Sequence, residues 1–390
     1  MGEITHANTL VIILLPSYRR TALLPHVLKS ILNAESDGIQ ERISVLIHNN
    51  YPKAKKEISQ IISQLPLQAR LDVFAVHRER TVDPVEGWFD ALLSVAKEGE
   101  TVILLGDDDL LTPWGMLNRY EVINNAKGDL LISNHASRVY FFENGSRLWA
   151  DLGNFKCPSE RKQATKWELS VQNHMRATFI SNHCYRNTRA FRSGVELAFS
   201  LSRKQKWAPS IYTTALIPAY LPYTIEASGG TVLSLDEHSV LRGSIYEEAI
   251  RQDYSDGGTT SFFSLLALNT FSNTDLHSNQ LQFDLLRSSL LKSLRSGILE
   301  NIGNRNIRLS MFRAGMRATN LRWLDLLGRD ILNKKLITRI IPQMRGWTLR
   351  RKNRNGNTLV QTSDFLSRLS ELYDQTRQEQ KKGSSEEKVL

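Results

Sequence analysis

The sequence is poor in cysteine and has no long apolar run. Only Cys157 and Cys184 occur in 390 residues, too few for a disulfide framework or a cysteine zinc site. No apolar stretch reaches the length of about eighteen residues that a membrane-spanning helix needs. The early run TLVIILLP follows an acidic residue and no basic leader, so it predicts a first strand and not a signal peptide. These absences favour a cytoplasmic protein of a reducing compartment.

The positive charge is concentrated in one segment. The whole chain carries +10, and residues 303–355 contain fourteen Lys and Arg against two Asp, a local charge of +12. Trp323 and Trp347 lie among these cations, a pattern typical of an anionic membrane surface, here the inner face of the cell membrane. A helical bundle with a solvated basic face explains the pattern equally well. Nucleic acid is not an expected partner, because no recognition motif accompanies the charge.

The first third of the chain alternates between strand and helix patterns. Short apolar runs predict strands, and Leu, Ile and Val at helical spacing predict the helices between them. The expected strands are 9–16, 42–50, 71–77 and 101–106, and the expected helices are 20–34, 53–65 and 85–99. This alternation predicts an α/β fold with a mostly parallel sheet flanked by helices.

The remaining chain divides into three expected parts. After a helix opening at Pro113 come a strand over 129–134, a hairpin turn at Asn144 and Gly145, and a late strand within 223–234. Residues 1–245 then form the catalytic domain and 246–355 a basic helical region. Residues 356–390 begin as an amphipathic helix and end in a polar tail expected to be disordered.

Three polar clusters follow predicted strands. They are PSYRR from residue 16, HNN from residue 48 and GDDD from residue 106. Ligands of open α/β sheets bind beyond the carboxyl ends of the strands, so we expect these clusters to converge on one edge.

Three adjacent carboxylates, Asp107, Asp108 and Asp109, repel one another unless a cation lies close by. Mg²⁺ and Mn²⁺ prefer such oxygen ligands and complete their coordination with phosphate oxygens and water. A solvated acidic turn before a helix is the alternative. The position after an apolar strand, beside two other polar strand ends, favours the metal site.

The two motifs together resemble those of the family-2-type nucleotide-sugar glycosyltransferases of the GT-A fold. IILLPSYRRTALLPHVLKSIL precedes TVILLGDDDLLTP by about ninety residues. The resemblance covers roughly residues 8–245 and implies a Rossmann-like GT-A domain that transfers sugar from a nucleoside-diphosphate sugar. It also implies Mn²⁺ or Mg²⁺ as cofactor, with a C-terminal helical region following the domain.

The resemblance assigns residues to the site. It implies metal ligation by Asp107 and Asp109, with Asp108 as a competitor because the family also frames the pair one residue earlier, where this chain has Gly106. His238 is a further candidate metal ligand. The implied nucleotide-sugar pocket consists of Pro16, Ser17, Tyr18, Arg19, His48, Asn49, Asn50, Asp107 and Asp108.

The chain departs from the family pattern at two places. His48 stands where the family has an Asp that binds uracil, so a UDP-sugar is favoured without being fixed. Pro209 and Ser210 stand where inverting members carry the general base. Asp236 and Glu237, expected to follow the late strand, are the leading substitutes, and Glu196 and Glu226 are others.

The sequence therefore predicts a metal-dependent glycosyltransferase, inverting by resemblance. Its expected acceptor is a saccharide or lipid-linked saccharide, as in surface polysaccharide or lipopolysaccharide synthesis. One alternative is a degenerate, catalytically weak scaffold. Another is a nucleotidyltransferase, which the absence of glycine after the first strand disfavours.

Overall fold

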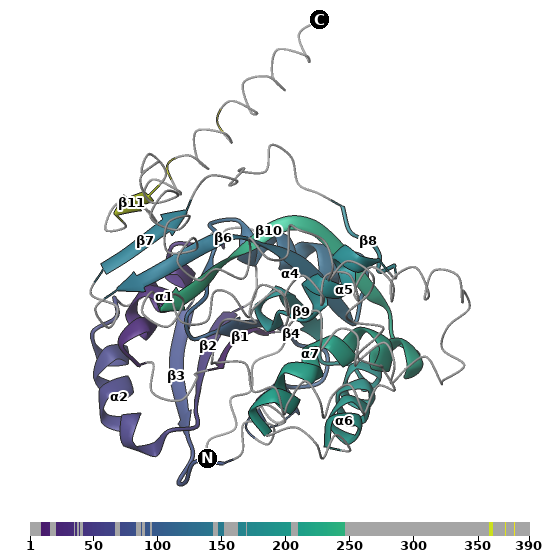
Figure 1. Cartoon of the computed structure of the whole chain (residues 1–390), viewed down its shortest axis with the longest axis horizontal. Coiled ribbons are helices and arrows are strands. Elements are labelled where there is room, and N and C mark those ends of the chain that lie inside the picture. The colour runs from purple at the N-terminus through teal and green to yellow at the C-terminus, as the bar shows by residue number, and fades with distance from the viewer. Residues whose placement is uncertain are drawn as a thin grey trace, which may run out of the picture.

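The protein was analysed as a computed structural model (Figure 1). The structure describes residues 9–15, 21–34, 36, 39, 42–66, 71–82, 87, 90–93, 96–142, 147–151, 163–168, 170–203, 210–245, 359–361, 371 and 378.

Four parallel strands form one half of the sheet in the order β3-β2-β1-β4. They are β1 (Thr9–Leu15), β2 (Arg42–Asn49), β3 (Leu71–His77) and β4 (Thr101–Gly106). Ile12 of β1 pairs with Val45 of β2 and with Ile103 of β4, and all three side chains are fully buried. These are the predicted strands, and their apolar character follows from burial on both faces.

The strand order reverses at β1. The chain adds β2 and β3 on one side of β1 and then places β4 on the other. Helices α1 (Leu24–Leu32) and α2 (Lys55–Ser63) connect the first three strands, and α2 lies beside β3 (Figure 1). Ser30 of α1 accepts the backbone N–H of Leu111 at 3.1 Å. Such a reversal opens a crevice at the carboxyl ends of the two central strands, here β1 and β4.

The other half of the sheet is mixed, so the expectation of a mostly parallel sheet holds only for the first four strands. β9 (His183–Arg186) runs antiparallel to β4 and to β6 (Leu130–Phe142). The long β6 also pairs with β7 (Arg147–Asp151) in the predicted hairpin and lies parallel to β10 (Val232–Ile245). The smaller strands are β5 (Leu110–Leu111), β8 (Thr165–Lys166) and β11 (Leu359–Gln361).

Helices cover the sheet beyond the acidic motif. The helix predicted near Pro113 is α4 (Gly115–Asn125). The helices α6 (Arg189–Arg203) and α7 (Ser210–Ala227) pack on each other at the end of the molecule remote from α2 (Figure 1). α5 (Val171–Ala177) and the short 3-10 turn η4 (Ile180–Asn182) precede β9.

The late strand was predicted with wrong bounds. Residues 223–227 end the helix α7, and the strand begins only at Val232. The two prolines inside α7, Pro218 and Pro222, and its apolar composition hide the helical period. Asp236 and Glu237 were expected to follow the strand, yet they lie inside it, at irregularities of the β6 pairing that accommodate polar residues.

Residues 246–355, predicted to be the basic helical region, lie outside the described residues. Beyond them, β11 returns to the sheet and pairs antiparallel with β7. No helix in the part of the chain that the structure describes is long and apolar enough to cross a membrane.

Candidate functional site

The three predicted polar clusters follow strands that end at the same level. Leu14 of β1 pairs with Ile47 of β2 and with Leu105 of β4, and Leu15 pairs with Gly106. His48 and Asp107 therefore begin their clusters at neighbouring positions along this edge. With about 4.8 Å between strands, the ends of β2 and β4 lie roughly 10 Å apart across β1.

Residues 16–19 lie outside the described residues. The predicted roles of Pro16, Ser17, Tyr18 and Arg19 in the pocket therefore stay predictions. Leu15, the residue before them, pairs with Gly106 at the start of the acidic motif.

The acidic residues 107–109 form a tight turn between β4 and β5, which we call the acidic turn. Asp107 and Asp109 are 4% and 3% exposed, and Asp108 is half-buried. The buried carboxylates exclude the simple alternative of a solvated acidic turn.

Both carboxylate oxygens of Asp109 accept hydrogen bonds from the protein. Ser181 of η4 donates its hydroxyl to Oδ2 at 2.5 Å, and the backbone N–H of Gly243 on β10 donates to Oδ1 at 2.9 Å. The Ser181 hydroxyl in turn accepts the N–H of Gly106 at 2.8 Å. Asp109 thus ties the acidic turn to two distant elements.

Burial raises the pKa of Asp109 to about 8, and the charge of Asp108 raises it as well. The hydrogen bonds from Ser181 and Gly243 and the charge of Arg242 act in the opposite direction. Desolvation and the repulsion between carboxylates therefore raise the pKa of Asp109 more than the hydrogen bonds and Arg242 lower it. The acidic turn thus lacks the nearby positive charge that would keep its carboxylates ionised.

Two glycines allow the turn to pack this closely. A Cβ on Gly106 would lie 2.7 Å from Oδ2 of Asp109. A Cβ on Gly243 would lie 1.5 Å from the backbone oxygen of Asp108. A side chain at position 106 would therefore displace the Asp109 carboxylate from its present position.

The side chains at the end of β2 bind the protein's own loops. Asn49 bonds the backbone of Tyr51 in both directions and contacts Nδ1 of His77 at 3.0 Å. Asn50 exchanges two hydrogen bonds with the backbone of Val82, which holds the segment after β3 against β2. Both amides therefore fix the loops that follow β2 and β3.

His48 is 5% exposed within β2. Burial lowers its pKa to about 4, and the charge of Arg78 lowers it as well. The ring is neutral at physiological pH. It therefore offers no cation to a phosphate.

His238, Asp236 and Glu237 lie on β10, at the irregularities of its pairing with β6. The hydroxyl of Thr112, three residues beyond Asp109, donates to the backbone carbonyl of His238 at 3.2 Å. The same carbonyl accepts the indole N–H of Trp114 at 3.1 Å.

The two candidate bases differ in their surroundings. Asp236 is exposed and forms an ion pair with the nearly buried Arg176, with Oδ1 and Nη2 2.6 Å apart. Glu237 is buried and accepts the Asn118 amide at 2.9 Å. These contacts stabilise the fold around α4 and α5, and the role of either carboxylate as a general base stays a prediction.

The other two acids stand on helices. Glu196 is exposed on α6. Glu226 is exposed at the end of α7, and desolvation raises its pKa.

A buried arginine behind the acidic turn was missed by the sequence analysis. Arg119 of α4 is fully buried, and its Nη1 donates to the backbone carbonyl of Ser181 at 2.9 Å. It also donates from Nε to Gly115, one turn earlier in α4. Arg119 therefore fixes η4, and Ser181 of η4 holds Asp109. No local sequence pattern predicts this role for Arg119.

The acidic turn offers oxygen ligands without forming a complete cage. Among the residues that the structure describes, no three His, Cys, Asp or Glu side chains converge as a metal site. Both oxygens of Asp109 accept hydrogen bonds, so Asp109 has a structural role in the turn whichever of the three carboxylates bind a metal. A Mg²⁺ or Mn²⁺ site with few protein ligands, completed by phosphate and water, fits this donor set.

No protein-family model matches the sequence, and neither does any curated protein. Two solved structures are similar to this chain at low identity. S. aureus TarS 1-349 with UDP-GlcNAc has 12% identity and a TM-score of 0.49, covering 95% of this chain and 92% of that one. The mannosyltransferase PcManGT of Pyrobaculum calidifontis, with GDP-Man and Mn²⁺, has 9% identity and a TM-score of 0.44, covering 87% and 85%. Similarity at this level concerns the fold and transfers no residue role or substrate.

Proposed function

We propose that the protein is a metal-dependent glycosyltransferase that uses a nucleoside-diphosphate sugar. The observation that supports this best is the buried acidic turn at the strand-order reversal, level with the ends of β1 and β2. A nucleoside at the β1 and β2 ends would place its diphosphate at the turn. The motif order of the sequence, which resembles family-2-type transferases, points to sugar as the transferred group.

The nucleoside side of the pocket is assigned to residues 16–19 and to the segments held by Asn49 and Asn50. Because the two amides bind their own loops, base recognition falls on backbone groups and on Tyr18 and Arg19. A UDP-sugar is the favoured donor. His48, neutral and buried, would contribute packing and not charge.

The metal is assigned to Asp107 and Asp108, and Asp109 positions them through its bonds to Ser181 and Gly243. When bound, a divalent cation would stabilise the charge on the departing diphosphate. The acidic turn supplies the carboxylates, and the buried backbone around it excludes water from one side.

In the proposed reaction an acceptor hydroxyl attacks the anomeric carbon and the bond to the diphosphate oxygen breaks. Inversion is expected from the resemblance alone. Asp236 and Glu237 stay the proposed candidates for the base that deprotonates this hydroxyl, Asp236 in an ion pair with Arg176 and Glu237 hydrogen-bonded to Asn118.

The experiment is a thermal-shift panel on the full chain with UDP, GDP, ADP and CDP, each with and without Mn²⁺. A bound nucleotide raises the melting temperature by mass action. We expect one base to give a shift that Mn²⁺ enlarges. The absence of any shift at millimolar nucleotide would exclude the proposed donor class.

The contacts of the two acids with Arg176 and Asn118 are the observation that favours a second function, that of a binding scaffold with weak catalysis. A scaffold would bind the nucleotide sugar and neither hydrolyse nor transfer it. Metal-dependent release of nucleoside diphosphate from a nucleotide sugar would show that the protein is an enzyme and not a scaffold. A nucleotidyltransferase would instead release pyrophosphate from a nucleoside triphosphate.

We also propose that residues 303–355 bring the protein to an anionic membrane surface that presents a lipid-linked acceptor. Each cation near such a surface contributes about 1 kcal/mol at moderate salt. Flotation with vesicles containing anionic lipid, compared with neutral vesicles, tests this. Equal flotation with both would contradict it.

A further inference from the structure

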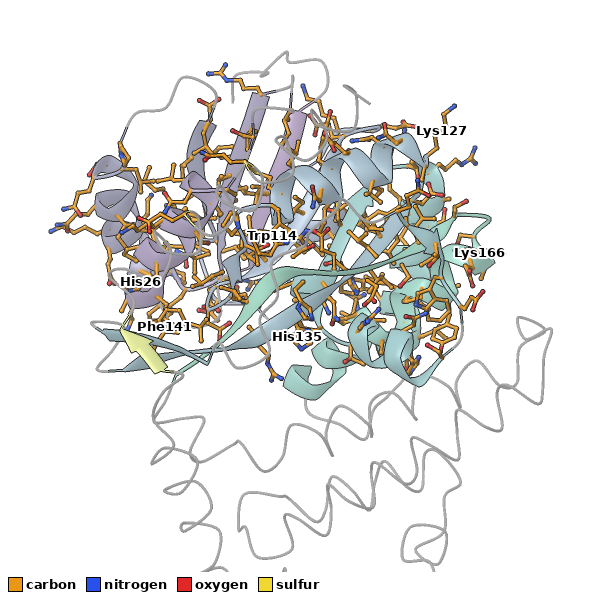
Figure 2. All side chains as sticks on the ribbon, turned by 90° about the horizontal axis from the view of Figure 1, so that it is seen from above. His26, Trp114, Lys127, His135, Phe141 and Lys166 are labelled. Atoms are coloured by element: carbon orange, nitrogen blue, oxygen red, sulfur yellow. The ribbon has the colours of Figure 1, made fainter. Side chains whose placement is uncertain are left out.

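A cation and an aromatic ring lie together beside the acidic turn. The Cζ atom of Arg242 lies 5.5 Å from the centroid of the Phe179 ring, within the range of a cation–π contact. The Phe179 ring also contacts His135, with the centroids 4.6 Å apart. Figure 2 shows His135 on β6, midway between the side where His26 and Phe141 are labelled and the side where Lys166 is labelled. All three side chains of this layer are partly exposed.

Asp109 fixes both halves of this pair. Its Oδ1 accepts the N–H of Gly243, the residue that follows Arg242 on β10. Its Oδ2 accepts the hydroxyl of Ser181, which follows Phe179 closely in the chain. One carboxylate therefore holds the strand that carries the cation and the turn that carries the ring.

The ring layer is itself anchored. Nδ2 of Asn182 lies 3.1 Å from Nδ1 of His135 and donates to the backbone carbonyl of Arg176 at 3.0 Å. His135 is thus held in place, and it supports Phe179 from β6. A guanidinium placed on such a layer loses little side-chain entropy when it binds a ligand.

We propose that Arg242 is the protein's own cation for the donor diphosphate, hydrogen-bonding its oxygens from a position fixed by Phe179 beside the acidic turn. This inference rests on the proposed function. The planar guanidinium can donate two parallel hydrogen bonds to phosphate oxygens. When the bond between the sugar and the diphosphate breaks, the electron pair moves onto a diphosphate oxygen, and Arg242 stabilises that charge.

The charge of the site supports the assignment. Two carboxylates and one divalent cation sum to zero, so a bound diphosphate needs further positive charge. Arg242 lies in this region, because the next residue, Gly243, donates its backbone N–H to Asp109. The competing role for Arg242 is neutralisation of the carboxylates alone, without contact to a ligand.

The test measures binding by titration calorimetry in saturating Mn²⁺. The probes are the nucleoside diphosphate that the wild-type chain binds and the monophosphate of the same base. We expect Arg242→Gln to weaken diphosphate binding by about 10-fold to 100-fold, the range for a hydrogen bond between charged groups. Monophosphate binding should change by less than about 3-fold. The matched control is Arg189→Gln, which removes the same charge from an exposed site on α6 and should change neither constant.

Phe179→Leu separates positioning from direct contact. Phe179→Leu should weaken diphosphate binding when Arg242 is present. In a chain that already carries Arg242→Gln it should not weaken binding further, because the ring acts only by positioning the arginine. Should Arg242→Gln fail to fold, Arg242→Lys carries the test. Lys keeps the charge and loses the planar fork, so about 3-fold to 10-fold weaker binding is expected.

The outcomes are distinct. A wild-type chain that binds no nucleoside diphosphate overturns the proposed function. A wild-type chain that binds one, with a folded Arg242→Gln or Arg242→Lys variant that binds it equally well, overturns only the role of Arg242. A loss that is equal for monophosphate and diphosphate also overturns it.

Discussion

The backbone N–H of Gly243 donates to Oδ1 of Asp109 at 2.9 Å, although 134 residues separate the two in the chain. The Cα of Gly243 lies so close to the turn that a Cβ there would meet the backbone oxygen of Asp108 at 1.5 Å. Backbone cannot yield as a flexible side chain does. The strand β10 and the acidic turn are therefore fitted to each other at this residue.

Gly243→Ala should separate β10 from the acidic turn and lower the free energy of unfolding by about 3 kcal/mol, at the upper end of overpacking costs. Chemical denaturation measures the loss. Gly99→Ala is the control, because nothing lies within 4 Å of its Cβ and only its φ of +87° opposes alanine. That strain costs about 1–2 kcal/mol. Equal losses in the two variants would contradict the close packing at Gly243.

The neighbouring acids Asp108 and Asp109 should differ in function when each is changed to alanine. Asp108→Ala should abolish the part of the nucleotide-induced thermal shift that depends on Mn²⁺. Asp109→Ala leaves the donors Ser181 and Gly243 without their acceptor and should lower stability by about 1–3 kcal/mol. The reverse pattern, with Mn²⁺ dependence lost only at Asp109, would return metal ligation to Asp109.

The parallel half of the sheet was predictable because its signals are local. Strands β1 to β4 are apolar runs whose carboxyl ends carry polar clusters, and parallel pairing alone then brings residues 48 and 107 to one edge. The bonds that shape the site are not local. Ser181 and Gly243 reach Asp109 from η4 and β10, and nothing in their own sequence surroundings indicates a carboxylate partner.

The bounds of the late strand β10 were predicted wrongly for a physical reason. A strand normally alternates apolar and polar residues, but β10 contains Asp236, Glu237 and His238 in a row at irregular pairing with β6. Arg176 and Asn118 satisfy the two acids from separate helices. Polar runs of this kind resemble surface turns until the partners are known.

Acid should remove the stability that buried, neutral histidines contribute to the fold. The pKa of His48 is about 4 in the fold, against about 6.5 for an unfolded chain. Between these values the unfolded state binds a proton at His48 that the native state does not, so the contribution of His48 to stability falls as pH drops from 6.5 to 4 and is constant above 6.5. Burial lowers the pKa of His183 to about 4 as well, with the same sign.

His48→Gln should make this decline shallower by up to about 1.4 kcal/mol per pH unit. Denaturant unfolding at several pH values between 4 and 8 measures the slope for both chains. A variant whose curve stays parallel to the wild type below pH 6.5 would show that His48 is already protonated in the native state.

Cys184 should be unreactive in the native protein. It is fully buried on β9, and burial raises the pKa of its thiol to about 12, against which the charge of Arg119 acts only weakly. Because the thiolate is the nucleophile, a disulfide reagent at pH 8 finds almost no Cys184 thiolate to react with.

Since the chain has only two cysteines, Cys157→Ser leaves Cys184 as its single thiol. We expect that variant to react with the reagent only after guanidinium is added, and then to release one equivalent of the coloured thiol. Cys184→Ser is the matched control for Cys157. Reaction of native Cys157→Ser within minutes would show that β9 opens on that time scale, and with it the strand that joins β4 to β6.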